Sequence, residues 1–388
     1  MSIKTESRIG APEVLFGLAT AILLIVVGVP MALIFFNAFW VDGALNVADV
    51  MKVLKSPETF QALGNSLVLA GGVTVTGTLV GTFFAWLVTR TDLPFKKTMK
   101  LMFLVPFMLP AFIGALAWKM LLSPRAGYVN RFWMDTLGFE SPLFDIYSYA
   151  GIILIETMYL FPFVFIQVSG ALERMDPTLE ESARISGADL FTITRKITIP
   201  LIMPSIVSGA LLICLYSMAH FGTVAVLGME VGIYNIPTLI YEKIHQSAGS
   251  WNSIRTATVL SMVLVTTAAI ILWIQNRVLS KGKYQIIAGK SFRPTELRLG
   301  VFRTPMLIFC CVYIFVTIIV PTATIFGVGA LKTYGLPLSL ENMTLHNFEY
   351  ILFEWELTRD SIWNSISLGL ASALVTMFCG VIISYVIV

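Results

Sequence analysis

The sequence is poor in charged residues. Asp, Glu, Lys and Arg make up 13% of its 388 residues, whereas soluble domains carry about 25%. Hydrophobic residues make up 57%. So few charges cannot cover the surface of a water-soluble protein of this length, and a lipid bilayer is the expected solvent. The net charge of +3 is also too small to indicate a nucleic-acid partner.

Histidine and cysteine are also scarce. The histidines are isolated in the sequence, and the motifs of zinc enzymes and serine hydrolases are missing. The four cysteines lie inside apolar runs without a C-x-x-C spacing, which indicates small buried hydrophobic residues. The sequence therefore predicts neither a catalytic site nor a cofactor, and it leaves any metal ligands unknown.

Long apolar runs dominate what is present. A helix needs about 20 apolar residues to cross the hydrocarbon core. We therefore predict an all-α polytopic membrane protein of about eight transmembrane helices. The first run is too long for the hydrophobic region of a signal peptide, so we expect it to be retained as a membrane helix. The eight runs cover about 14–39, 66–89, 101–122, 149–172, 201–224, 256–276, 304–330 and 363–388.

The distribution of Lys and Arg predicts the orientation of these spans. Alternate connections, 1–12, 90–100, 173–199 and 277–303, contain 17 of the 26 basic residues. Cytoplasmic loops carry the excess of basic residues. The N-terminus is therefore expected in the cytoplasm.

Two short matches indicate an internal repeat. Pro30–Phe35 and Pro321–Phe326 share four of six residues, and Asn65-Ser66-Leu67 corresponds to Asn364-Ser365-Ile366. In both copies the proline-containing match precedes the Asn-Ser match along the chain. We expect each Asn-Ser pair to begin a helix. The chain is thus predicted to contain one complete half and the start of a second, parallel half.

The segment between the fourth and fifth runs is too long for a simple turn. Asp176 followed by Pro177 predicts a helix start with Asp176 as N-cap, and Gly187 suits a C-terminal cap about ten residues later. Ala188 to Thr198 then predicts a second short helix, which Pro200 closes. Its apolar face favours contact with a partner protein.

This segment resembles the EAA loop, E-A-A-x3-G-x9-I-x-L-P, of permease subunits of binding-protein-dependent ABC importers. The departures are Ser182 at the first Ala of the motif and Ile199 at its Leu. The resemblance implies the type I importer permease fold, with a coupling loop at 176–200 that binds a dimer of cytosolic ATPases. The matching residues are Glu181, Ser182, Ala183, Gly187, Ile197 and Pro200.

The resemblance covers most of the chain and implies its organisation. Residues 1–60 correspond to a leading membrane helix and outer loop, 61–277 to a complete permease domain, 278–303 to a basic cytoplasmic linker, and 304–388 to an incomplete second half. This arrangement is similar to that of fused ferric-iron permeases of the bacterial inner membrane. It implies a periplasmic binding protein and a second permease half or subunit as further partners. Thiamine, polyamine and phosphonate remain alternative substrates for the same class of transporter. A membrane scaffold that transports nothing remains a remote alternative function.

Glu156 and His220 are ionisable residues inside the apolar runs, and Lys119 lies near the end of one. Such residues usually face the bundle interior or a water-filled cavity. Glu156 is expected either to hydrogen-bond a Ser or Thr on a neighbouring helix or to line the substrate path. His220, near the outer end of the fifth span, has the same two interpretations.

Overall fold

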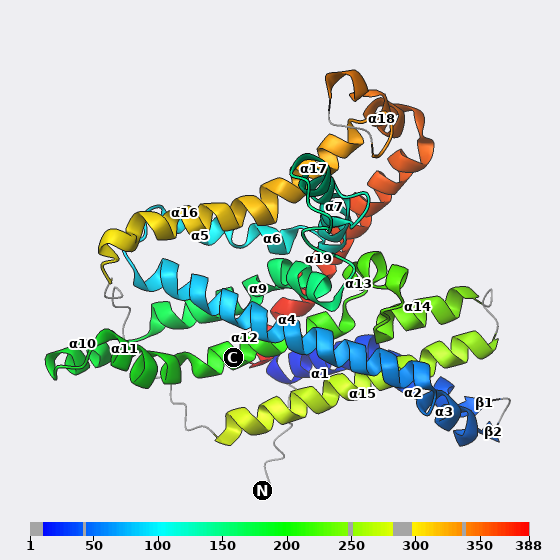
Figure 1. The fold of residues 1–388 in the computed structure, drawn as a ribbon. Coiled ribbons are helices and arrows are strands. Elements are labelled where there is room, and N and C mark those ends of the chain that lie inside the picture. The colour runs from blue at the N-terminus through cyan, green and yellow to red at the C-terminus, as the bar shows by residue number, and fades with distance from the viewer. Residues whose placement is uncertain (1–10, 42–43, 247–250, 282–296, 336–338, 388) are drawn as a thin grey trace, which may run out of the picture. The chain divides into compact units, whose positions relative to one another are not determined.

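The protein is described here by a computed structural model covering residues 11–41, 44–246, 251–281, 297–335 and 339–387. These residues are almost all helical (Figure 1). They form two compact units, one of residues 48–328 and one of residues 1–47 with 329–388. The predicted basic linker 278–303 lies largely outside the described residues.

The unit of residues 48–328 contains a series of helices of very different lengths. They are α3 (Val47–Leu54), α4 (Pro57–Arg90), α5 (Lys96–Met102), α6 (Val105–Met108), α7 (Ala111–Leu122), α8 (Tyr128–Arg131), α9 (Tyr149–Arg174), α10 (Thr178–Ile185), α11 (Leu190–Ile193), α12 (Ile199–Ala219), α13 (Gly222–Leu227), α14 (Ile236–Gln246), α15 (Trp251–Lys281), α16 (Arg303–Ile314) and α17 (Val320–Gly329).

The other unit contains the first and last predicted spans. Its helices are α1 (Ala11–Leu23), α2 (Val29–Phe39), α18 (His346–Glu349) and α19 (Glu356–Ile387), with the short antiparallel strands β1 (Trp40–Val41) and β2 (Ala44–Leu45). Within this unit α1 packs against α19. Most described side chains of α19 are exposed and apolar, as expected of a helix surrounded by lipid.

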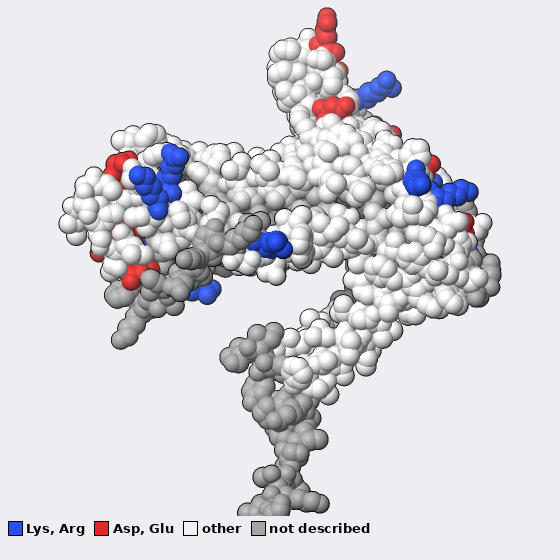
Figure 2. Space-filling view, turned by 90° about the horizontal axis from the view of Figure 1, so that it is seen from below, with Lys and Arg blue, Asp and Glu red and all other residues white. Residues whose placement is uncertain are grey.

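The prediction of about eight spans is confirmed. Among the described residues, seven helices are long and apolar enough to cross a membrane, and one further pair of helices qualifies jointly. Most of the surface drawn in Figure 2 is uncharged, with Lys, Arg, Asp and Glu in a few small groups.

The predicted span 101–122 is not one straight helix, because the chain bends by 88° between 96–108 and 111–122. Leu109 is extended and Pro110 caps α7. A proline disfavours the helical conformation of the residue before it and offers no N–H to the preceding turn. The two halves are therefore separate short helices.

The expected helix start at Asn65-Ser66 is also wrong. Helix α4 begins eight residues earlier, where Ser56 accepts a hydrogen bond from the Thr59 N–H (3.2 Å) and Pro57 occupies the first turn. This N-cap and proline start the helix before the apolar run itself begins. Asn65 and Ser66 therefore lie inside a helix, and so do Asn364 and Ser365 in α19.

The core of the larger unit is built by α4, α9 and α12, which lie side by side (Figure 1). A Cβ on Gly81 of α4 would lie 2.7 Å from the Phe161 carbonyl oxygen of α9, and one on Gly209 of α12 would lie 2.8 Å from the Val164 Cα. These glycines let the backbones approach more closely than any other residue would. Gly81 therefore allows α4 to pack closely on α9.

Candidate functional site

The loop that resembles the EAA segment folds as a short surface helix. Helix α10 begins at Thr178, whose N–H donates to Oδ1 of Asp176 (2.9 Å). Pro177 already has helical backbone angles, so the capping side chain is that of Asp176, with Pro177 at the first helical position as predicted. Asp176 satisfies a backbone N–H that the helix leaves unpaired.

Gly187 ends α10 as predicted. Its φ is +84°, the left-handed conformation that glycine adopts without strain. The N–H of Ala188 donates to the Ala183 carbonyl and that of Gly187 to the Arg184 carbonyl, both at 3.0 Å. This pair of hydrogen bonds is the Schellman C-cap. The sharp reversal brings the chain from α10 directly into α11.

The prediction that Ala188–Thr198 is a separate helix closed by Pro200 is wrong. Asp189 directly precedes α11, and the Thr192 hydroxyl and N–H donate to its carboxylate and hold its pKa below the usual value. A π-helical turn over Thr194–Thr198 then connects α11 to α12 without a break. Because this wider turn changes the hydrogen-bond pattern, it accommodates Pro200 inside a continuous helix.

The outer surface of this loop combines apolar and polar side chains. Ile185 is 88% exposed and Phe191 70%, with Leu179 also exposed beside them. Large apolar side chains exposed on a polar surface helix indicate a protein-binding face. Of the six predicted coupling residues, Ala183 and Ile197 are half-buried and the others, Glu181, Ser182, Gly187 and Pro200, are exposed.

The inner side of α10 is fixed by a residue that the sequence analysis missed. Glu180 is 7% exposed, and its Oε1 lies 3.4 Å from a guanidinium nitrogen of Arg90, which is 1% exposed. The Thr198 hydroxyl donates to the same oxygen (2.6 Å). Glu180 therefore joins α10 to the end of α4 and to the start of α12. Arg90 ends an apolar run, but only the fold shows its partner, 90 residues away.

The two predicted pathway residues lie together in the structure. Glu156 is fully buried in α9, with Oε1 3.0 Å from Nδ1 of His220. The Ser217 hydroxyl donates to Oε2 of the same carboxylate. His220 follows the last residue of α12 in an extended conformation, which turns its ring toward α9. The three side chains thus form one buried polar cluster between α9 and α12.

Further polar contacts hold the segment after His220. The Asn235 amide donates to the His220 carbonyl (2.8 Å), and the Asn65 amide donates to the Tyr234 carbonyl (2.8 Å). Ser66 accepts from the Ile236 N–H (2.9 Å). The Asn-Ser pair seen in the repeat therefore anchors the start of α14 to α4. No group of three or more His, Cys, Asp or Glu residues suited to a metal ion occurs among the described residues.

These features define a multi-pass membrane protein with a short surface helix, α10, at one end of its spans and a buried polar cluster between α9 and α12. The chain belongs to the family of binding-protein-dependent transport system inner membrane components, whose family model matches residues 77–281. It is therefore an inner membrane component of such a transport system. The matched region contains both the loop 176–200 and the cluster of Glu156, Ser217 and His220.

Individual relatives carry names from several transport systems. The chain is 30% identical over 269 residues to a putative ferric transport system permease protein of Haemophilus influenzae (68% of this chain, 41% of the relative). It is 27% identical over 370 residues to the ferric transport system permease protein of Actinobacillus pleuropneumoniae (92% and 51%). A spermidine/putrescine permease protein of Escherichia coli is 29% identical over 235 residues (59% and 82%). The chain spans about half the length of the ferric relatives.

Solved structures show the same fold. A chain of a bacterial alginate ABC transporter, solved in complex with an alginate pentasaccharide-bound periplasmic protein, matches with a TM-score of 0.54 and 21% identity. The match covers 69% of this chain and 93% of that one. It confirms the importer permease fold that the sequence resemblance implied.

Proposed function

We propose that the chain is the membrane-spanning part of an ABC importer that is driven by cytosolic ATPases through the loop 176–200. The observation that carries the proposal is the two-sided character of α10. Its outer side exposes Leu179 and Ile185, while its inner side is fixed to α4 and α12 through Glu180. A protein that moves α10 therefore also moves the ends of two spans.

This connection accounts for coupling without chemistry in the chain itself. Hydrolysis of ATP changes the distance between the two ATPase subunits. A partner that binds one state of the permease more tightly than the other shifts the population toward that state. The buried ion pair between Arg90 and Glu180 resists separation, because each charge would otherwise remain unpaired in an apolar environment. α10 and α4 are therefore expected to move as one body.

The cargo we propose is ferric iron, delivered by a periplasmic binding protein. Two relatives carry ferric transport names, and the carboxylate of Glu156 offers the oxygen ligands that a hard cation prefers. Glu156 and His220 are then residues of the translocation path, buried in the state seen here. The spermidine/putrescine relative supports polyamine as the second candidate, since a carboxylate also pairs with an ammonium group.

The same proposal includes the layout of the chain. Residues 61–277 form the permease domain, the N-terminus lies in the cytoplasm, and residues 304–388 begin a second half. A second permease half or subunit then completes the path, and two ATPases bind the complex.

Uptake of labelled substrates tests the function. A strain lacking its own importer and expressing the complete transporter should accumulate labelled ferric iron, and less spermidine, thiamine or phosphonate. Glu156→Gln should lower iron uptake at least tenfold, because it removes the charge but preserves the side-chain shape. Full uptake by this variant would exclude Glu156 from the translocation path. Preferential uptake of spermidine would show that the cargo is a polyamine and not ferric iron.

A further inference from the structure

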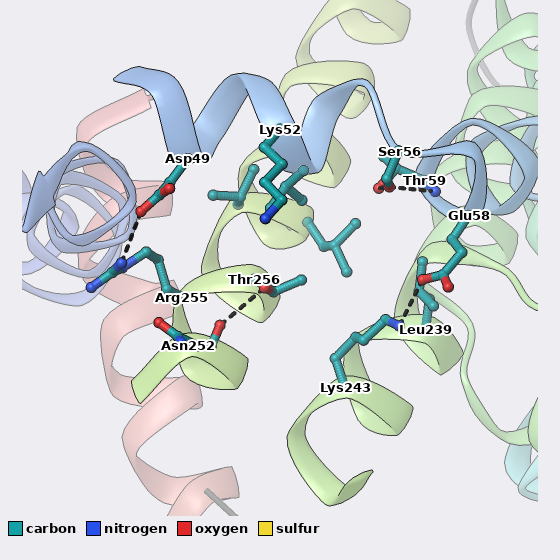
Figure 3. Close-up of a pocket in the computed structure, with 13 residues that line it drawn as sticks. Asp49, Lys52, Ser56, Glu58, Thr59, Leu239, Lys243, Asn252, Arg255 and Thr256 are labelled. Atoms are coloured by element: carbon teal, nitrogen blue, oxygen red, sulfur yellow. Dashed lines mark hydrogen bonds and ion pairs between the residues drawn. The ribbon is translucent and has the colours of Figure 1, made fainter. Parts of the chain in front are cut away.

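A charged cavity lies in the larger unit, far from the coupling loop. It has a volume of about 370 Å³ and is bounded by α3, the start of α4, α14 and the start of α15 (Figure 3). Helix α4 has 34 residues and spans about 50 Å at 1.5 Å per residue. The cavity adjoins its first turn, and Arg90 at its last turn contacts α10. The cavity is therefore at the opposite end of the unit from α10.

Two ion pairs hold the walls of this cavity together. Arg255 of α15 lies 3.0 Å from Oδ2 of Asp49 in α3, and Lys243 of α14 lies 2.6 Å from Oε2 of Glu58 in α4. The cationic side chains are 22% and 26% exposed, whereas the carboxylate side chains are 44% and 62% exposed. Solvent therefore screens the negative members of the pairs more than the positive ones.

A third cation has no counter-charge. Lys52 extends from α3 into the space between the two ion pairs (Figure 3). It makes no hydrogen bond or ion pair with any residue that the structure describes. The cavity thus contains three cations against two carboxylates, and its excess charge is positive.

We propose that this cavity binds a phosphate group. Its three cations come from three different helices, and Lys and Arg each have more N–H donors than the single ion pair uses. A phosphate group is tetrahedral, so its oxygens accept from donors on several sides, whereas the two oxygens of a carboxylate lie in one plane. The group can be inorganic phosphate or the phosphodiester of an anionic lipid headgroup, which has fewer charged oxygens around the same tetrahedral phosphorus. The proposal is independent of the cargo and of ATPase coupling.

The test uses the full chain purified in a non-ionic detergent. Isothermal titration calorimetry measures binding of inorganic phosphate, with sodium chloride of equal ionic strength as the reference and acetate as a competing class of anion. Native mass spectrometry counts bound phosphatidylglycerol. The variant is Lys52→Gln, and Lys55→Gln is the matched control, because Lys55 follows α3 and does not line the cavity.

We expect Lys52→Gln to weaken phosphate binding at least tenfold and Lys55→Gln to leave it unchanged. If phosphatidylglycerol alone binds and is lost in Lys52→Gln, the proposal stands with the lipid as source. Glu58→Gln should strengthen binding several-fold, because it frees Lys243 from its carboxylate. Absence of binding by both probes, equal weakening in the two lysine variants, or acetate binding as tightly as phosphate would overturn the proposal.

Discussion

Among single residues, the buried pair of Arg90 and Glu180 has the clearest energetic consequence. Both side chains are removed from water, and the Thr198 hydroxyl donates to Glu180, whereas Arg90 has no charged partner but Glu180 among the described residues. The ε-oxygen of Glu180 serves both partners. Removing the charge of Glu180 alone would leave Arg90 buried without compensation.

Glu180→Gln should therefore destabilise the protein by about 3–5 kcal/mol. Glu181→Gln is the matched control, because Glu181 is exposed, and surface changes typically alter stability by less than about 0.5 kcal/mol. Chemical unfolding in detergent measures both. Adding Arg90→Met to Glu180→Gln should restore part of the loss, since the uncompensated charge is gone. Equal stability of the two single variants would contradict the assignment of Glu180 as a buried anchor.

The sequence predicted some of these residues and missed others for a physical reason. Glu156 and His220 were identified because an ionisable residue inside an apolar run is costly and therefore conspicuous. Arg90 stands at the end of such a run, where a basic residue is ordinary. Glu180 stands beside Glu181, which the motif already explains. Their pairing depends on a long-range contact that no local pattern contains.

Among the helices, hydropathy predicted the spans well but not their interruptions. Pro162 and Pro204 lie inside α9 and α12, which remain continuous, whereas Pro110 separates α6 from α7. A proline therefore marks a break only where neighbouring packing does not support a continued helix. The same ambiguity explains why Pro200 was wrongly expected to end a helix.

The packing of α4 against α9 yields a second prediction. A Cβ at Gly81 would press on the Phe161 carbonyl and on Val164, and these atoms belong to a helix backbone that cannot easily yield. Gly81→Ala should cost about 1–3 kcal/mol through overpacking. In the matched control, Gly71→Ala in the same helix, the new Cβ meets nothing within 4 Å. A thermal unfolding midpoint that falls equally in both variants would contradict close packing at Gly81.

For the whole molecule, the motif spacing predicted the family before the fold was known. The fixed intervals from Glu181 to Pro200 resemble those of one permease family, and the family match over 77–281 confirms that family. The cavity around Lys52 was not foreseen, because its walls come from segments about 200 residues apart whose charges look ordinary on a sequence. Local chemistry thus identified the class of protein, and tertiary contacts added sites within it.

The central claim is that α10 transmits the action of an ATPase to the membrane helices. It is tested most directly by ATP-dependent uptake of labelled ferric iron into vesicles containing the complete transporter with Ile185→Asp. Ile185 is 88% exposed on α10, and Leu137→Asp is the matched control, since Leu137 is 52% exposed outside the loop. We expect Ile185→Asp to lower uptake at least tenfold and to reduce co-purification of the ATPase, while Leu137→Asp retains both. Undiminished uptake with Ile185→Asp would contradict the account.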